Sequence, residues 1–180
     1  MQLRADQLAS HLAKTLAPLY VLHGDEPLLV IEAGDAIRGA ARKQGFEERE
    51  VIVAGTGFKW DTLMLAAGNL SLFGGNKLVD LRIPNGKPGR DGGEALQRYC
   101  ERLPEDVLTL VTLPRLDFQQ QKAAWFNALD QHGATLRVET LDRKALPAWL
   151  AQRLSRQGQR VRGGEEGQRT LAFFADRVEG

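Results

Sequence analysis

The sequence predicts an α/β fold in which helices flank a mostly parallel sheet, followed by a smaller helical domain. Short apolar runs rich in branched residues alternate with longer segments of helical period, as in repeated strand–helix–strand units. Residues 107–111 are almost all apolar, as expected of a strand that helices cover on both faces. After Glu139 the pattern becomes purely helical, so we expect an α/β domain at residues 1–140 and a helical domain at 141–180.

Each element of the first domain follows from this alternation. The expected strands are residues 19–23, 50–53, 77–83, 107–112 and 135–139. The expected helices are residues 4–16, 26–44, 59–69, 92–102 and 119–131. Leu63, Leu65 and Ala66 form the predicted buried stripe of the third of these helices. Residues 85–93 are rich in glycine, with a proline among them, and are predicted to form a mobile loop.

The second domain is predicted from two apolar sets at helical spacing. These sets are Leu146, Trp149, Leu150 and Leu154, then Leu171, Phe173, Phe174 and Val178, with glycines at 158, 163 and 164 between them. Glu165 and Glu166 should occupy the first turn of the last helix, where the helix dipole favours acids. The chain ends before this domain could close a core, so we expect it to be part of a longer protein.

Composition excludes several classes of function. The 180 residues include 24 Lys and Arg against 23 Asp and Glu, so a formal net charge of +1 marks no general attraction to nucleic acid or membrane surfaces. The single Cys100 rules out a disulfide framework and fits a buried position in a reducing compartment. No segment resembles a signal peptide or approaches the roughly 18 apolar residues of a membrane span. We therefore expect a soluble, cytoplasmic protein without membrane contact.

The first strand–helix loop is where a parallel α/β fold usually holds its ligand. Counting on from Gly24, a phosphate-binding loop would need another glycine, a lysine and a serine or threonine, but residues 29–31 are Leu-Val-Ile. Asp25 and Glu26 would repel a triphosphate. We predict that Asp25 is the N-cap of the following helix, Glu26 lies in its first turn and Pro27 lies near its first position.

Other catalytic chemistry is equally absent from the sequence pattern. No acid stands directly at the end of strand 107–112 to hold magnesium, and Asp117 is predicted to cap the next helix. His11, His23 and His132 are scattered, without zinc-ligand spacing, and are predicted to be structural. The sequence contains no nucleophile elbow and no dinucleotide fingerprint. We expect no cofactor, no metal and no enzymatic activity.

Two other functions stay open from the residues. One is a nucleotide-binding ATPase with an unrecognised phosphate site at residues 24–29. The other is a DNA-binding module that uses the basic segment Arg153, Arg156, Arg160 and Arg162. This segment has no interleaved aromatic residues, so a solvated helix face explains it more simply.

Residues 69–77 place two large apolar side chains where a helix should end. Leu72 and Phe73 directly precede Gly74 and Gly75, a pattern that favours a helix end and then a tight turn. The two side chains either fold back onto their own domain or point outward toward a partner.

Five segments in this order resemble the amino-terminal part of the delta subunit of the bacterial DNA polymerase III clamp loader. They are residues 19–29 (LYVLHGDEPLL), 44–48 (QGFEE), 70–73 (LSLF), 123–126 (AAWF) and 146–150 (LPAWL). The resemblance implies an AAA+-like fold with a helical lid domain, and no binding or hydrolysis of ATP. It also implies a third, collar domain that joins the pentameric loader and is absent from this chain.

The resemblance further implies a clamp-binding motif at Asn69, Leu70, Ser71, Leu72 and Phe73. Leu72 and Phe73 would enter a hydrophobic pocket of the sliding clamp (beta) and help to open the ring, without ATP hydrolysis by this subunit. Asn69 departs from the glutamine that clamp-binding motifs prefer. The other implied partners are the ATPase subunits and delta prime, with DNA inside the assembled loader.

Overall fold

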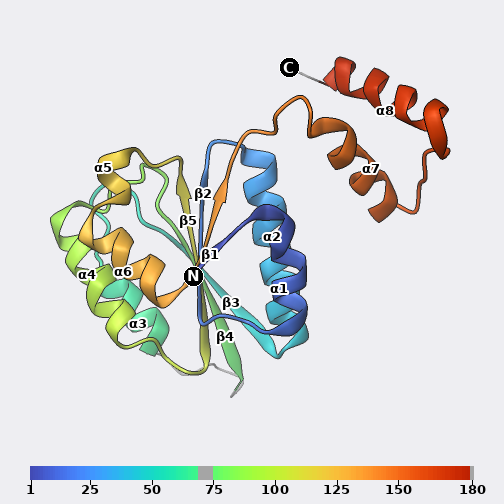
Figure 1. The fold of residues 1–180 in the computed structure, drawn as a ribbon. Coiled ribbons are helices and arrows are strands. Elements are labelled where there is room, and N and C mark those ends of the chain that lie inside the picture. The colour runs from blue at the N-terminus through green and yellow to red at the C-terminus, as the bar shows by residue number, and fades with distance from the viewer. Residues whose placement is uncertain (69–74, 179–180) are drawn as a thin grey trace. The chain divides into compact units, whose positions relative to one another are not determined.

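A computed structural model describes residues 1–68 and 75–178 of the chain (Figure 1). The chain divides into two compact units, Met1–Glu139 and Thr140–Gly180. The first unit contains the sheet, and the second contains two helices, α7 (Leu146–Arg156) and α8 (Gly164–Val178).

The sheet of the first unit has six strands in the order β1-β6-β2-β5-β4-β3, and every pair is parallel. The strands are β1 (Gln2–Leu3), β2 (Leu19–Gly24), β3 (Phe46–Val53), β4 (Asn76–Arg82), β5 (Val107–Pro114) and β6 (Ala134–Val138). The predicted parallel α/β fold is thus confirmed. Two residues are too few to carry a period, so the sequence pattern missed β1.

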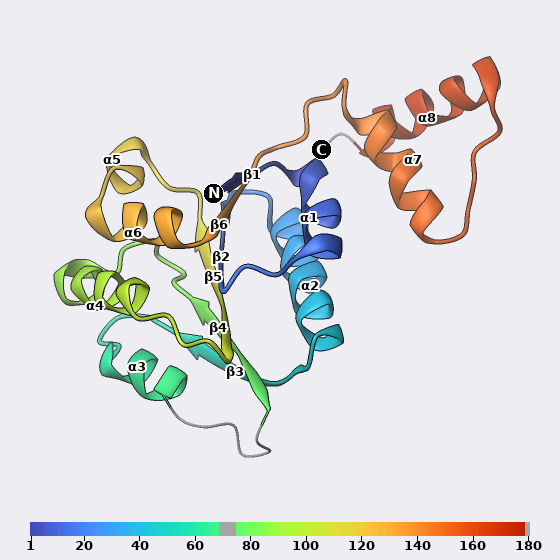
Figure 2. The same cartoon turned by 60° about the horizontal axis from the view of Figure 1, so that its bottom comes forward.

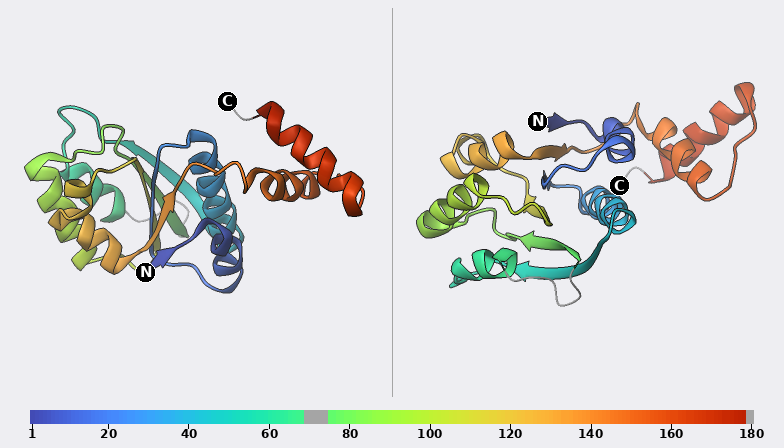
Figure 3. Two further views of the ribbon diagram at one scale, coloured as in Figure 1. Left: turned by 45° about the horizontal axis from the view of Figure 1, so that its top comes forward. Right: turned by 90° about the horizontal axis from the view of Figure 1, so that it is seen from below.

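Helices cover both faces of this sheet (Figure 2). On one face lie a 3₁₀ turn (Ala5–Gln7), α1 (Leu8–Lys14) and α2 (Pro27–Lys43). On the other lie α3 (Asp61–Gly68), α4 (Gly89–Glu101), α5 (Phe118–Gln121) and α6 (Ala124–His132), as the further views also show (Figure 3).

Each face of the sheet has its own apolar core because side chains alternate along a strand. Leu19 and Val21 of β2 join the core under α3, α4 and α6, whereas Tyr20 and Leu22 join the core under α1 and α2. This double burial is the reason why the central strands read as continuous apolar runs.

The structure corrects three of the predicted elements. The helix expected at residues 119–131 is two helices, because Ala123 has an extended backbone (ψ 144°) between α5 and α6. The loop expected at residues 85–93 ends early, since α4 already begins at Gly89. Leu65 is 63% exposed, and the buried stripe of α3 is instead Leu63, Ala66 and Ala67.

A tertiary contact is compatible with glycine inside α4. A Cβ atom at Gly92 would lie 2.3 Å from the Trp60 ring, so the glycine lets this ring lie directly against the helix. Glycine lowers helix propensity by about 1 kcal/mol relative to alanine, and packing of this kind can offset that cost.

In the second unit, the predicted start of the last helix is confirmed. Helix α8 begins at Gly164 with Glu165 and Glu166 in its first turn, and Pro147 stands at the start of α7. Arg143, just before α7, forms an ion pair with Asp176 of α8 at 2.6 Å. This contact links the two helices of the unit.

Candidate functional site

The carboxyl ends of β2 and β5 form the position where this fold class usually binds a ligand. Gly24 ends β2 and lies between Pro114 of β5 and Val138 of β6. A Cβ atom at Gly24 would lie 2.2 Å from the Val138 carbonyl oxygen. Close packing of the strands therefore explains this glycine without any phosphate.

Asp25 does not cap the following helix, contrary to the prediction. Helix α2 begins at Pro27, its N-cap is Glu26 without a side-chain capping bond, and its first turn holds no acid. The carboxylate of Asp25 instead accepts a hydrogen bond from Arg115 Nη1 at 2.9 Å, which lowers the pKa of this carboxyl. Arg115 follows β5, 90 residues along the chain, so no local pattern indicates this pair.

The Asp25–Arg115 ion pair lies at the strand ends, where a phosphate-binding loop would hold its ligand. A triphosphate there would meet a carboxylate, and Pro27 at the helix start has no N–H to donate. The lysine and hydroxyl that such sites use are missing from residues 24–31. The geometry does not favour nucleotide binding of the usual kind.

The remaining candidates for chemistry have structural surroundings. Asp117 is a helix cap as predicted, because its carboxylate accepts a hydrogen bond from the backbone N–H of Gln120 at 2.8 Å. His23 is buried with its ring 5.3 Å from that of Phe126, and burial lowers its pKa. His132 Nδ1 lies 2.8 Å from the Ala128 carbonyl oxygen, and His11 Nε2 lies 3.0 Å from the Tyr20 hydroxyl.

The described residues also contain no group of three or more His, Cys, Asp or Glu side chains that could hold a metal ion. Within the same ranges, no helix has both the length and the apolar character that crossing a bilayer would need.

The predicted binding motif Asn69, Leu70, Ser71, Leu72 and Phe73 lies outside the described residues. Both of its flanks are described: α3 ends at Gly68 and β4 begins at Asn76. Two exposed apolar side chains of α3, Met64 and Leu65, precede the motif by one to two helical turns.

A buried lysine joins these two flanks. Lys77 of β4 donates a hydrogen bond from Nζ to the Ala66 carbonyl oxygen of α3 at 2.9 Å. The same Nζ lies 2.5 Å from a carboxylate oxygen of Glu50 and 3.8 Å from one of Glu48, both on β3. The end of α3 and the start of β4 are therefore held together, a role for Lys77 that apolar periodicity could not indicate.

The arginines of the basic segment in the second unit have different surroundings. Arg153 lies over the Trp149 ring at 5.0 Å, and Arg162 forms an ion pair with Glu166 at 3.1 Å. Arg160 is exposed, and the side chain of Arg156 lies outside the described part of the chain. The contacts described for Arg153 and Arg162 do not favour a nucleic-acid site.

Solved structures of other proteins share the fold of this chain. A solved structure of a Bacillus subtilis DNA clamp loader delta protein matches with a TM-score of 0.67 at 17% identity, over 96% of this chain and 56% of that chain. The Aeropyrum pernix ORC2 protein matches with a TM-score of 0.50 at 17% identity, over 96% of this chain and 55% of the other. At such low identity these matches show the fold.

Sequence comparison shows the family. The family model "DNA polymerase III, delta subunit" matches residues 20–139, and the chain belongs to this family. The DNA polymerase III subunit delta of Escherichia coli K12 is 31% identical over 153 residues, which cover 85% of this chain and 45% of that protein. The Haemophilus influenzae subunit delta is 30% identical with the same coverage. The chain thus spans about half the length of these relatives, and the predicted family is confirmed.

Proposed function

We propose that this chain is the part of a clamp-loader subunit that binds the sliding clamp through Asn69–Phe73 and helps to open the ring. The single observation that carries the proposal is the family match over residues 20–139, which includes this motif. ATP hydrolysis is left to other subunits, in keeping with the Asp25–Arg115 ion pair at the usual phosphate position.

The proposed contact is small, but burial of its two apolar side chains would contribute useful binding free energy. Burial of Leu72 and Phe73 in a pocket of the clamp would contribute about 1.5 to 3 kcal/mol for each side chain. A few such anchors often supply most of the affinity of an interface. Ring opening additionally requires tighter binding to the open clamp than to the closed one, because a ligand shifts an equilibrium only by its differential affinity.

The proposal extends to the whole assembly. In a full-length protein, residues 141–180 would belong to a lid domain, and a collar domain would join the ATPase subunits and delta prime. DNA would lie inside the assembled loader, in the cytoplasm and without membrane contact.

The test measures binding of this chain to immobilised clamp by surface plasmon resonance. We expect Leu72→Ala/Phe73→Ala to weaken binding by about 100-fold or more, since loss of at least about 3 kcal/mol corresponds to that factor. The matched control is Phe173→Ala/Phe174→Ala, which removes two exposed aromatic side chains of α8 and should leave the affinity unchanged. Equal binding by the motif variant and the unaltered chain would refute the proposed site.

A further inference from the structure

The outer part of the sheet exposes apolar side chains on the face that carries α1 and α2. Val51 and Val53 of β3 are 46% and 55% exposed, whereas Leu108 and Leu110 of β5 are fully buried on the same side. Ile52, between the two valines, points to the opposite face and is buried there. Helix α2 therefore covers the middle of this face and leaves the apolar part of β3 in solvent.

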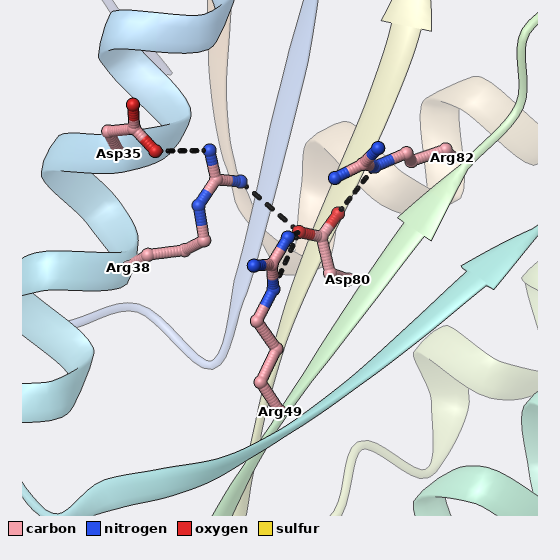
Figure 4. A network of polar contacts seen from close by, with 5 residues as sticks. All are labelled: Asp35, Arg38, Arg49, Asp80 and Arg82. Carbon is pink, nitrogen blue, oxygen red and sulfur yellow. Dashed lines mark hydrogen bonds and ion pairs between the residues drawn. The ribbon is translucent and has the colours of Figure 1, made fainter.

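Figure 4 shows a cluster of charges on α2, β3 and β4. Two of its members, Asp80 and Arg82, are the register partners of these valines. The carboxylate of Asp80 on β4 is completely buried, and its Oδ2 accepts hydrogen bonds from Arg38 of α2 at 3.1 Å and from Arg49 of β3 at 2.6 Å. The other oxygen lies 3.5 Å from Nε of Arg82. Arg38 also pairs with Asp35 at 2.7 Å.

This cluster leaves positive charge and donors at the surface. The three guanidinium groups outnumber the two carboxylates that they contact, and each guanidinium has five N–H donors. Arg49 and Arg82 use few of these donors on Asp80 while 39% and 47% of their side chains remain accessible. Because Asp80 holds the guanidinium groups in place, they are preorganised for a further carboxylate.

The valines and the charged groups lie side by side on two neighbouring strands. Asp80 pairs in register with Val51, and Arg82 pairs with Val53. On α2, the exposed Ile31 stands seven residues before Arg38 and therefore lies on the same helix side. We call Ile31, Arg38, Arg49, Val51, Val53 and Arg82 the α2–β3 face.

We propose that the α2–β3 face binds a protein segment in which apolar side chains are flanked by Asp or Glu, supplied by a component of the assembled clamp loader. The choice of assembly rests on the proposed function. Acidic side chains of the partner would complement the positive charges of Arg49 and Arg82. Apolar side chains of the partner would bury the exposed Ile31, Val51 and Val53.

Two observations favour a protein over nucleic acid. A phosphate backbone would leave the three branched apolar side chains without partners, and the α2–β3 face contains no aromatic ring on which a base could stack. In addition, β3 is the last strand of the sheet and its outer backbone edge is not paired within the described residues. An extended segment can add to such an edge as a further strand.

The test uses the full-length protein in a reconstituted loader with its clamp and primed DNA. The photoreactive residue p-benzoylphenylalanine replaces Val53, and adducts are identified by mass spectrometry after irradiation. We expect an adduct with a protein chain, at a segment that contains Asp or Glu beside apolar residues. Absence of an adduct, or an adduct with DNA alone, would overturn the proposal.

Charge variants test the role of the cations in the same assay. We expect Arg82→Glu to lower the adduct yield by about tenfold or more, because close charge pairs at interfaces contribute more than about 1.4 kcal/mol. Arg90→Glu, on the exposed surface of α4, is the matched control and should change nothing. Arg82→Gln serves as a milder variant should Arg82→Glu unfold the chain, and unchanged yield with a folded Arg82 variant would contradict the proposal.

A separate photoreactive substitution keeps the two proposals distinguishable. The same residue in place of Phe73 should give an adduct with the clamp if the proposed function is correct. A protein adduct at position 53 without a clamp adduct at position 73 would support the α2–β3 face and count against the motif, and the reverse result would do the opposite.

Discussion

Replacement of the buried carboxylate of Asp80 should strongly destabilise the first unit. In Asp80→Asn the side chain keeps its shape but loses the charge that compensates Arg38, Arg49 and Arg82. Removal of one partner from a buried ion pair typically costs about 3–5 kcal/mol. Arg49 and Arg82 are partly exposed and can recover water, and an amide oxygen still accepts a hydrogen bond, so we expect a loss of about 2–4 kcal/mol.

Urea unfolding at pH 7 measures this loss. In a Trp149→Phe background the fluorescence of Trp60 and Trp125 reports on the first unit alone, since Trp149 lies in the second. With a urea slope of about 1–3 kcal/mol per molar, the midpoint should fall by about 0.7 M or more. Asp91→Asn is the control, because that carboxylate is exposed and should change stability by less than about 0.5 kcal/mol. A loss below about 1 kcal/mol in Asp80→Asn would refute the argument that this carboxylate organises the arginine cluster.

Three further predictions concern the strand ends and the core. Burial lowers the pKa of His23 below its ordinary value near 6.5, so the folded state disfavours its protonation. Stability should therefore decline as pH falls from 7.5 to 5.5, and the urea midpoint of His23→Gln should decline less over this range. Equal declines of the urea midpoint in both proteins would contradict a contribution of His23 to the pH dependence. Burial raises the pKa of the Cys100 thiol to about 12. The native protein should therefore react with a thiol reagent at pH 8 only as fast as it unfolds. Immediate labelling of Cys100 without urea would contradict its burial. Gly24→Ala should lower the free energy of unfolding in urea by about 1–3 kcal/mol, because its Cβ would clash with the Val138 carbonyl. Gly39→Ala, with open space in α2, is the control and should be neutral or stabilising. Equal stabilities of the two variants would disprove the close approach of Gly24 to Val138.

Local patterns in the sequence were sufficient for most of the first unit. The apolar run of β5 and the alternation of strands and helices indicated the parallel sheet, because burial on both faces requires apolar side chains at every position. Asp117 and the acids at the start of α8 were also predictable, since a cap acts on backbone groups only a few residues away. The motif at Asn69–Phe73 came from the family resemblance rather than from periodicity.

Errors arose where a local pattern had more than one tertiary outcome. Asp25 has the residue type and position of a helix cap, but it pairs with Arg115, 90 residues away. Leu65 fits the apolar stripe of α3, yet the orientation of this helix on the sheet exposes it. Glycines near the start of α4 suggested a loop, but Gly92 lies within the helix and packs against the Trp60 ring.

By itself, then, the sequence determined the fold class, the order of the elements and the absence of a phosphate-loop pattern, because these depend on residue types at short spacing. Only the tertiary structure decided that Lys77 joins α3 to β4 and that Asp80 gathers arginines from α2, β3 and β4. The partners of a buried charge depend on strand order and register, which bring distant residues together. Apolar periodicity carries no information about which strands become neighbours.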